Sequence, residues 1–164
     1  MSNSLQRREF LKRGGVITAG AAVASTVSGP RVEAAGHAKR VVVAALKDIK
    51  PNTPIEFAYP AEEPAALLDM GRPVEGGVGP DRSIVAFSTL CQHMGCPLEY
   101  KETSATFFCG CHASAFDPAK GGNAFEGPST RGLPRIALSI TPEGQVVATG
   151  VASGLVYGRA CNTV

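Results

Sequence analysis

The chain has 164 residues, enough for one domain with its own hydrophobic core. Its formal net charge is only +2, and the residues after position 34 carry eleven basic and twelve acidic side chains, so no basic surface for nucleic acid is expected. Tryptophan is absent, and 19 glycines and 12 prolines favour many short strands joined by turns over long helices.

Residues 1–34 are predicted to be an export signal. The run RREFLK at residues 7–12 resembles the twin-arginine motif, and small residues offer a cleavage site after Ala34 or Ala35. A twin-arginine signal is an address read by a receptor, and its route carries folded proteins, which predicts a periplasmic location. The alternative is an uncleaved membrane anchor over residues 14–30, although this uncharged stretch is rich in Gly, Ala, Ser and Thr and a span needs about 20 predominantly apolar residues.

Residues 36–90 contain short apolar runs separated by prolines. Strands are expected at residues 40–46, 54–59, 65–70 and 83–89. The glycine-rich residues 76–80 are expected to form a turn, because no phosphate-binding lysine sequence or helix follows them.

Four of the five cysteines and two of the three histidines lie in two boxes, CQHMGC from residue 91 and CGCH from residue 109. Thiolate and imidazole ligands at this density indicate a bound metal. Each box pairs one cysteine with one histidine, and a Rieske 2Fe–2S centre requires this because one iron takes two thiolates and the other takes two imidazoles. The expected ligands are Cys91 and Cys109 on the inner iron, and His93 and His112 on the outer iron. A mononuclear zinc site is the alternative, because tetrahedral zinc accepts the same ligand types.

The boxes, C-x-H-x-G-C and C-x-C-H-x-S, resemble the cluster loops of Rieske proteins of the cytochrome bc type. The resemblance implies an all-β fold with an antiparallel sandwich or barrel base and an inserted cluster-binding subdomain, here about residues 91–133 of a domain spanning residues 36–164. It also implies that a disulfide between Cys96 and Cys111 joins the two loops. The family usually has G-P-x-P in a loop covering the cluster; here the sequence from Gly127 is GPST, so the second proline is missing and the lid is expected to be less rigid.

The same resemblance assigns three residues that adjust the cluster. Ser114 matches a serine that donates to a bridging sulfide, whereas Phe116 stands where high-potential members have a tyrosine that donates to a ligand thiolate. The chain thus keeps the serine donor and lacks the tyrosine donor. Because such hydrogen bonds stabilise the reduced cluster, an intermediate reduction potential is expected. The alternatives are a loop hydroxyl bonded to nearby backbone for Ser114 and core packing for Phe116. Met94 is expected to shield the cluster, and it could also conform to a docking partner.

The second half of the chain returns to strands. They are expected at residues 105–109, 134–140, 145–149 and 155–159, with turns at residues 121–122 and 142–144. Cys161 is the odd cysteine, and the sequence does not separate a free thiol in a packed tail from an accidental surface cysteine. His37 lies beside the expected cleavage site and is interpreted as a solvated residue.

Only His37 remains outside the boxes, so the chain lacks the ligands for the mononuclear iron of an oxygenase. We therefore expect the electron-transfer subunit of an oxidoreductase, with no catalytic residues of its own. The segments PVEGGVGP from residue 73, CQHMGCP from residue 91 and YGR from residue 157 resemble the Rieske small subunit of arsenite oxidase. This resemblance implies a large molybdopterin subunit with a 3Fe–4S cluster as partner, and a periplasmic cytochrome c or cupredoxin as electron acceptor.

Three other functions remain as alternatives. One is the Rieske subunit of a cytochrome bc complex that oxidises quinol. A soluble Rieske ferredoxin is disfavoured by the export signal and by Cys96 and Cys111, which such ferredoxins usually lack. A zinc-stabilised interaction module would carry no redox centre, and its visible and EPR spectra would distinguish it from the others.

Overall fold

The computed structural model describes residues 39–163, so the predicted signal, the alternative anchor over residues 14–30 and His37 lie outside the described residues. Its strands are β1 (Val41–Ala45), β2 (Ile55–Ala58), β3 (Pro64–Asp69), β4 (Ile84–Ser88), β5 (Glu99–Lys101), β6 (Thr106–Phe108), β7 (Ala115–Asp117), β8 (Asn123–Glu126), β9 (Arg135–Ile140) and β10 (Gln145–Ser153). Two short 3-10 helices, η1 (Leu46–Asp48) and η2 (Pro118–Lys120), complete the elements. Within residues 39–163, no helix has the length and apolar character needed to cross a membrane.

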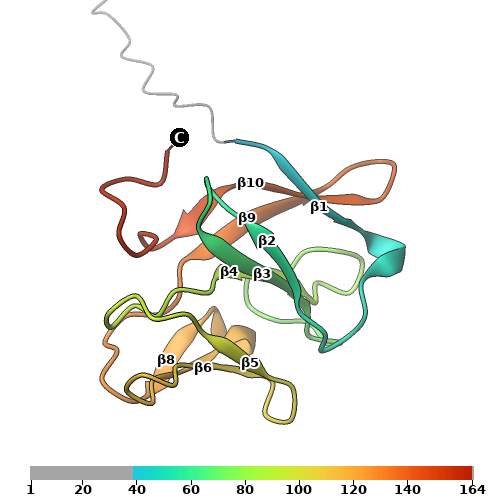
Figure 1. The fold of residues 1–164 in the computed structure, drawn as a ribbon. Coiled ribbons are helices and arrows are strands. Elements are labelled where there is room, and N and C mark those ends of the chain that lie inside the picture. Colours follow the sequence, from blue (N-terminus) through green and yellow to red (C-terminus); the bar gives the residue numbers. More distant parts are fainter. Residues whose placement is uncertain (1–38, 164) are drawn as a thin grey trace, which may run out of the picture. The chain divides into compact units, whose positions relative to one another are not determined.

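The strands form two antiparallel sheets (Figure 1). The larger sheet has the order β1-β10-β9-β4-β3-β2, and the smaller has the order β5-β6-β7-β8. The edge strands β1 and β2 of the larger sheet approach each other, so this sheet is a nearly closed barrel. The predicted all-β antiparallel fold is thereby confirmed.

Strands β3 and β4 form a wall between two hydrophobic cores. Successive side chains of a strand point to opposite faces, so Leu67 and Ala86 lie in the core of the larger sheet. Leu68 and Phe87 lie in the other core, where the Phe87 ring meets Phe107 of the smaller sheet edge-to-face with the centroids 6.5 Å apart. Burial on both faces explains why the first four residues of β4 are a continuous apolar run without polar alternation.

The smaller sheet is inserted between β4 and β9 (Figure 1). It is fastened to the loop before β2 by the Tyr100 hydroxyl, which donates to Oδ1 of Asn52 at 2.7 Å, while Nδ2 of Asn52 donates to the Glu102 carbonyl oxygen at 2.9 Å. Cys91 and Cys109 belong to the core between the two sheets. The first residue of each cysteine box is therefore part of the core between the two sheets.

Most of the expected strands are present. One expected strand is absent, and three observed strands were not predicted from the sequence. The strand expected at residues 155–159 is wrong: this segment turns, because Gly154 and Gly158 adopt positive φ angles of 74° and 83° and the Val156 amide donates to the Asn162 side chain. Strands β5, β7 and β8 were not expected. Each has only three or four residues, too few to show a two-residue alternation of apolar and polar side chains.

Candidate metal centre

The first cysteine box is a closed backbone loop that follows β4. The Cys91 amide donates to the Cys96 carbonyl oxygen at 2.8 Å, and the Gly95 amide donates back to the Cys91 carbonyl oxygen at 2.8 Å. Gly95 turns the chain with a φ of 76°, a conformation that glycine adopts without a steric penalty.

The second box repeats this arrangement between β6 and β7. The Cys109 amide donates to the Ser114 carbonyl oxygen at 2.8 Å, and the Ala113 amide donates to the Cys109 carbonyl oxygen at 3.0 Å. Ala113 takes the place of Gly95 and has a φ of 58° despite its side chain. The two loops are thus matching backbone structures, each beginning with a cysteine, and this relationship is invisible in the letter spacing because the histidines occupy different positions.

Cys91 and Cys109, the first residues of the two loops, are each only 1% exposed. Burial raises the pKa of the Cys91 thiol, and the neighbouring Cys109 thiol raises it further, whereas hydrogen bonds from the backbone amides of His93 and Met94 lower it. A bound metal ion favours the thiolate form of cysteine, so a pair of buried cysteines at the start of two facing loops suits metal coordination through sulfur.

The two histidines also lie together, nearer the surface. The His93 and His112 rings are perpendicular, with their centroids 4.9 Å apart. His93 is half-buried and His112 is exposed. Nδ1 of His93 is buried and has no hydrogen-bond partner among the described residues. Because an unpaired buried nitrogen is costly, this atom fits a metal ligand.

Cys96 and Cys111 are bonded to each other across the loops, with their Cα atoms 6.6 Å apart. The Cys109 sulfur lies within 4.8 Å of both disulfide sulfurs. Since Cys96 and Cys111 are consumed in the disulfide, this group of three sulfurs is not a ligand set. The disulfide instead holds the two loops together next to one of the buried thiols.

The residues expected to adjust the cluster occupy different environments. Ser114 is fully buried, and its Oγ accepts a hydrogen bond from the Ser129 amide at 3.2 Å. Because the hydroxyl accepts this bond, its proton can be donated to another group. Phe116 is fully buried in the core that contains both cysteines. Met94 is 61% exposed, so most of its side chain faces solvent.

The GPST loop packs closely on the second box. A Cβ atom added to Gly127 would overlap the backbone of Ala113 and Ser114, so only glycine permits this approach. Ser129 ties the loop to Ser114 through its amide, and its own hydroxyl donates to the Arg131 carbonyl oxygen at 3.0 Å. The sequence did not indicate Ser129, because a backbone donor leaves no signature in a side chain.

Comparison with known proteins places these loops in a family. Residues 39–137 match the family model of the Rieske [2Fe-2S] domain. The chain belongs to the Rieske [2Fe-2S] family. It therefore carries a Rieske 2Fe–2S cluster, and the family match favours this centre over the zinc alternative.

Individual relatives extend the match beyond the cluster loops. The iodate reductase subunit IdrB of Denitromonas iodatirespirans is 34% identical over 162 residues, covering 96% of this chain and 86% of that protein. The cytochrome bc1 complex Rieske iron-sulfur subunit of Streptomyces lividans is 38% identical, but over 68 residues that cover 41% of this chain and 40% of that protein. Among solved structures, the soluble domain of the Rieske protein II (soxF) from Sulfolobus acidocaldarius has a TM-score of 0.65 at 24% identity, covering 75% of this chain and 82% of that one, which supports the fold.

Proposed function

We propose that Cys91 and Cys109 bind the inner iron of the Rieske cluster and that His93 and His112 bind its outer iron. The observation that carries this assignment is the unpartnered, buried Nδ1 of His93, in a ring perpendicular to that of His112. The two buried thiols support it, because they occupy equivalent first positions in two matching loops. When bound, the cluster supplies a one-electron redox centre whose potential is raised by its two neutral imidazole ligands.

The surrounding residues define how such a centre exchanges electrons. The fold excludes water from Cys91 and Cys109, whereas the exposed His112 and half-buried His93 lie where a partner protein can approach. Ser114 is assigned to donate its remaining proton toward a cluster sulfur. Phe116 has no hydroxyl to add a second such bond, so the expected potential is intermediate between members with both donors and members with neither.

We further propose that the chain is the electron-transfer subunit of an oxidoreductase with a large molybdopterin subunit. The similarity to an iodate reductase subunit over 96% of the chain supports a subunit of an oxidoreductase. The segments near residues 73, 91 and 157 resemble the Rieske small subunit of arsenite oxidase, and this resemblance supports the large molybdopterin partner. In an iodate reductase the Rieske centre would deliver electrons to the large subunit. In an arsenite oxidase it would receive them and pass them to a periplasmic cytochrome c or cupredoxin.

The quinol-oxidising cytochrome bc complex is the alternative assembly. The similarity to the Streptomyces lividans subunit of that complex extends over 41% of this chain, whereas the similarity to the iodate reductase subunit includes almost the whole chain. The longer match favours the molybdopterin partner. The twin-arginine motif supports a periplasmic location for the assembly.

The ligand assignment is tested by EPR of the reduced protein. Cys91→Ser and His112→Ala should each abolish the Rieske signal, because each removes one metal ligand. Cys161→Ser is the matched control and should keep the signal, since the Cys161 sulfur is exposed and contacts Thr163 rather than the cluster loops. A normal signal in either ligand variant would remove that residue from the assignment.

The partner and substrate are tested on the native complex. Purification from a cell extract freed of membranes should yield this chain together with a larger subunit and molybdenum. Iodate-dependent oxidation of the reduced Rieske centre would identify an iodate reductase, and arsenite-dependent reduction of the oxidised centre would identify an arsenite oxidase. Reduction by quinol in a complex without molybdenum would instead support the cytochrome bc alternative.

A further inference from the structure

The segment after β10 folds back on itself without pairing as a strand. Val156 is fully buried, and its amide donates to Oδ1 of Asn162 at 3.1 Å. Nδ2 of Asn162 donates to the Gly154 carbonyl oxygen at 2.8 Å, so one side chain holds both ends of the turn. The Arg159 amide closes the turn on the Val156 carbonyl oxygen at 3.1 Å. This segment, residues 154–163, is called the C-terminal strap below.

Arg159 anchors the C-terminal strap to the larger sheet. Its guanidinium forms an ion pair with Glu63, the residue before β3, and the two side chains are only 18% and 21% exposed. The same guanidinium donates to the carbonyl oxygens of Cys161 and Thr163 at 3.0 and 2.9 Å. Partial burial and several simultaneous hydrogen bonds distinguish this pair from an isolated surface ion pair.

Between these two attachments, Tyr157 rests on the first cysteine box. A Cβ atom added to Gly95 would overlap the Tyr157 ring, so the ring lies directly against the glycine backbone. Gly95 turns the loop between His93 and Cys96, and its amide donates to the Cys91 carbonyl oxygen. The C-terminal strap therefore touches the box at its turning residue.

The two boxes differ at this position in a way that explains the contact. The second box turns at Ala113 and is covered by the loop that begins at Gly127. The first box turns at a glycine, which restricts the backbone less than any other residue. The Tyr157 ring occupies the space beside Gly95 that the Cβ atom of any other residue would need.

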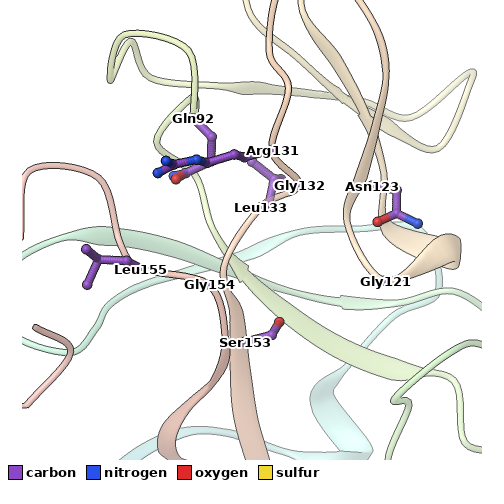
Figure 2. A pocket seen from close by; sticks show the side chains of 9 residues that line it. All are labelled: Gln92, Gly121, Asn123, Arg131, Gly132, Leu133, Ser153, Gly154 and Leu155. Carbon is purple, nitrogen blue, oxygen red and sulfur yellow. The ribbon is translucent and has the colours of Figure 1, made fainter. Parts of the chain in front are cut away.

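Two hollows lie beside the contact between Tyr157 and the first box. Gln92 and Arg131 line both hollows, and His93 and Tyr157 also line the second. Figure 2 shows the Gln92 and Arg131 side chains close together and Leu155 of the C-terminal strap set apart from them, along the same hollow. Residues of the C-terminal strap and of the first box thus line both hollows together.

We propose that Tyr157 is a positioning residue for the first cluster loop, held in place by the Arg159–Glu63 ion pair. Its ring fixes the turn at Gly95 and so fixes the backbone that carries His93 and Cys91. This inference rests on the proposed role of these two residues as cluster ligands. A role in positioning requires that the ring matters and that the phenolic hydroxyl does not.

The test compares Tyr157→Ala with Tyr157→Phe in the cluster-loaded protein. Hydrogen–deuterium exchange, measured by mass spectrometry on the peptide that spans residues 91–98, should be about tenfold faster in Tyr157→Ala, because the turn opens more often. The Rieske EPR signal should broaden as the loop samples more conformations. Tyr157→Phe keeps the ring and should restore both wild-type exchange and the wild-type line shape.

A second pair of variants tests the anchor. Arg159→Met should speed exchange of the same peptide, since it releases the C-terminal strap without altering Tyr157. Glu99→Gln is the control, because it removes an ion pair with Lys101 whose side chains are 70% and 41% exposed and lie in the smaller sheet. Unchanged exchange and line shape in Tyr157→Ala would overturn the positioning role of the ring, as would a Tyr157→Phe variant no better than Tyr157→Ala. Unchanged exchange in Arg159→Met would overturn the role of the Arg159–Glu63 ion pair as its anchor.

The outcomes separate this proposal from the ligand assignment. If His93→Ala kept a normal Rieske signal, the ligand assignment would fail while the exchange results still measured the contact. If His93→Ala lost the signal but Tyr157→Ala left exchange and line shape unchanged, only the positioning role would fail.

Discussion

Replacing both Cys96 and Cys111 with serine should shorten the lifetime of the cluster much more than it changes the reduction potential. The disulfide joins residues 15 positions apart, and the chain-entropy model gives about 3 kcal/mol of stabilisation for a closed loop of this length. If removing the disulfide lowers the free-energy barrier to opening the two loops by this full amount, the cluster is lost about a hundredfold faster. The potential should move little, because the disulfide is neutral and carries no strong hydrogen-bond donor.

The assay is the decay of the visible absorption of the oxidised cluster at constant temperature, because loss of a bound cluster is governed by a rate rather than by an equilibrium. Cys161→Ser is the control for removing a thiol and should decay as slowly as wild type. Voltammetry on the same samples reports the potential. A double variant as durable as wild type, or a mass spectrum of the native protein with both thiols free, would refute the reasoning.

Three further predictions concern the core and the loop that covers the second box. Phe116→Tyr should raise the midpoint potential, because a hydroxyl added to this fully buried ring can donate to a cluster thiolate; an unchanged or lower value in voltammetry would contradict this role. Ser114→Ala should lower the potential by removing a donor, whereas Ser129→Ala should leave it nearly unchanged, because the donor to Ser114 is the backbone amide of Ser129; equal potentials for the two variants would refute the assignment. Gly127→Ala should lower the free energy of unfolding by at least about 2 kcal/mol, through its positive φ and its overlap with the second box, while Gly144→Ala, also at positive φ but in open space, should cost less in the same denaturant titration.

The expected strands show which parts of the fold the sequence can predict. The apolar run of β4 and the alternation of apolar and polar residues over residues 54–59 indicate strands, and both strands are present. The segment at residues 155–159 was misassigned because its apolar residues resemble a strand, while the decisive bonds come from the side chains of Asn162 and Arg159. Such contacts depend on tertiary structure rather than on local propensity.

The candidate site shows a similar division. Residue types and their pairing predicted the metal centre, because the chemistry of two thiolates and two imidazoles is specific. The equivalence of the two loops could not be predicted, since it resides in backbone hydrogen bonds and in the turns at Gly95 and Ala113. The contact between Tyr157 and Gly95 joins residues far apart in the sequence, and neither residue type indicates it.

The central claim is that two histidines and two cysteines of this chain bind one 2Fe–2S cluster. Pulsed EPR of the reduced protein labelled with ¹⁵N-histidine measures this most directly, because histidine nitrogens bound to iron couple to the unpaired electron. The account predicts two distinct strongly coupled histidine nitrogens and two irons per chain, and no Rieske signal in His93→Ala or His112→Ala. A spectrum without histidine couplings, or a protein that contains zinc in place of iron, would contradict it.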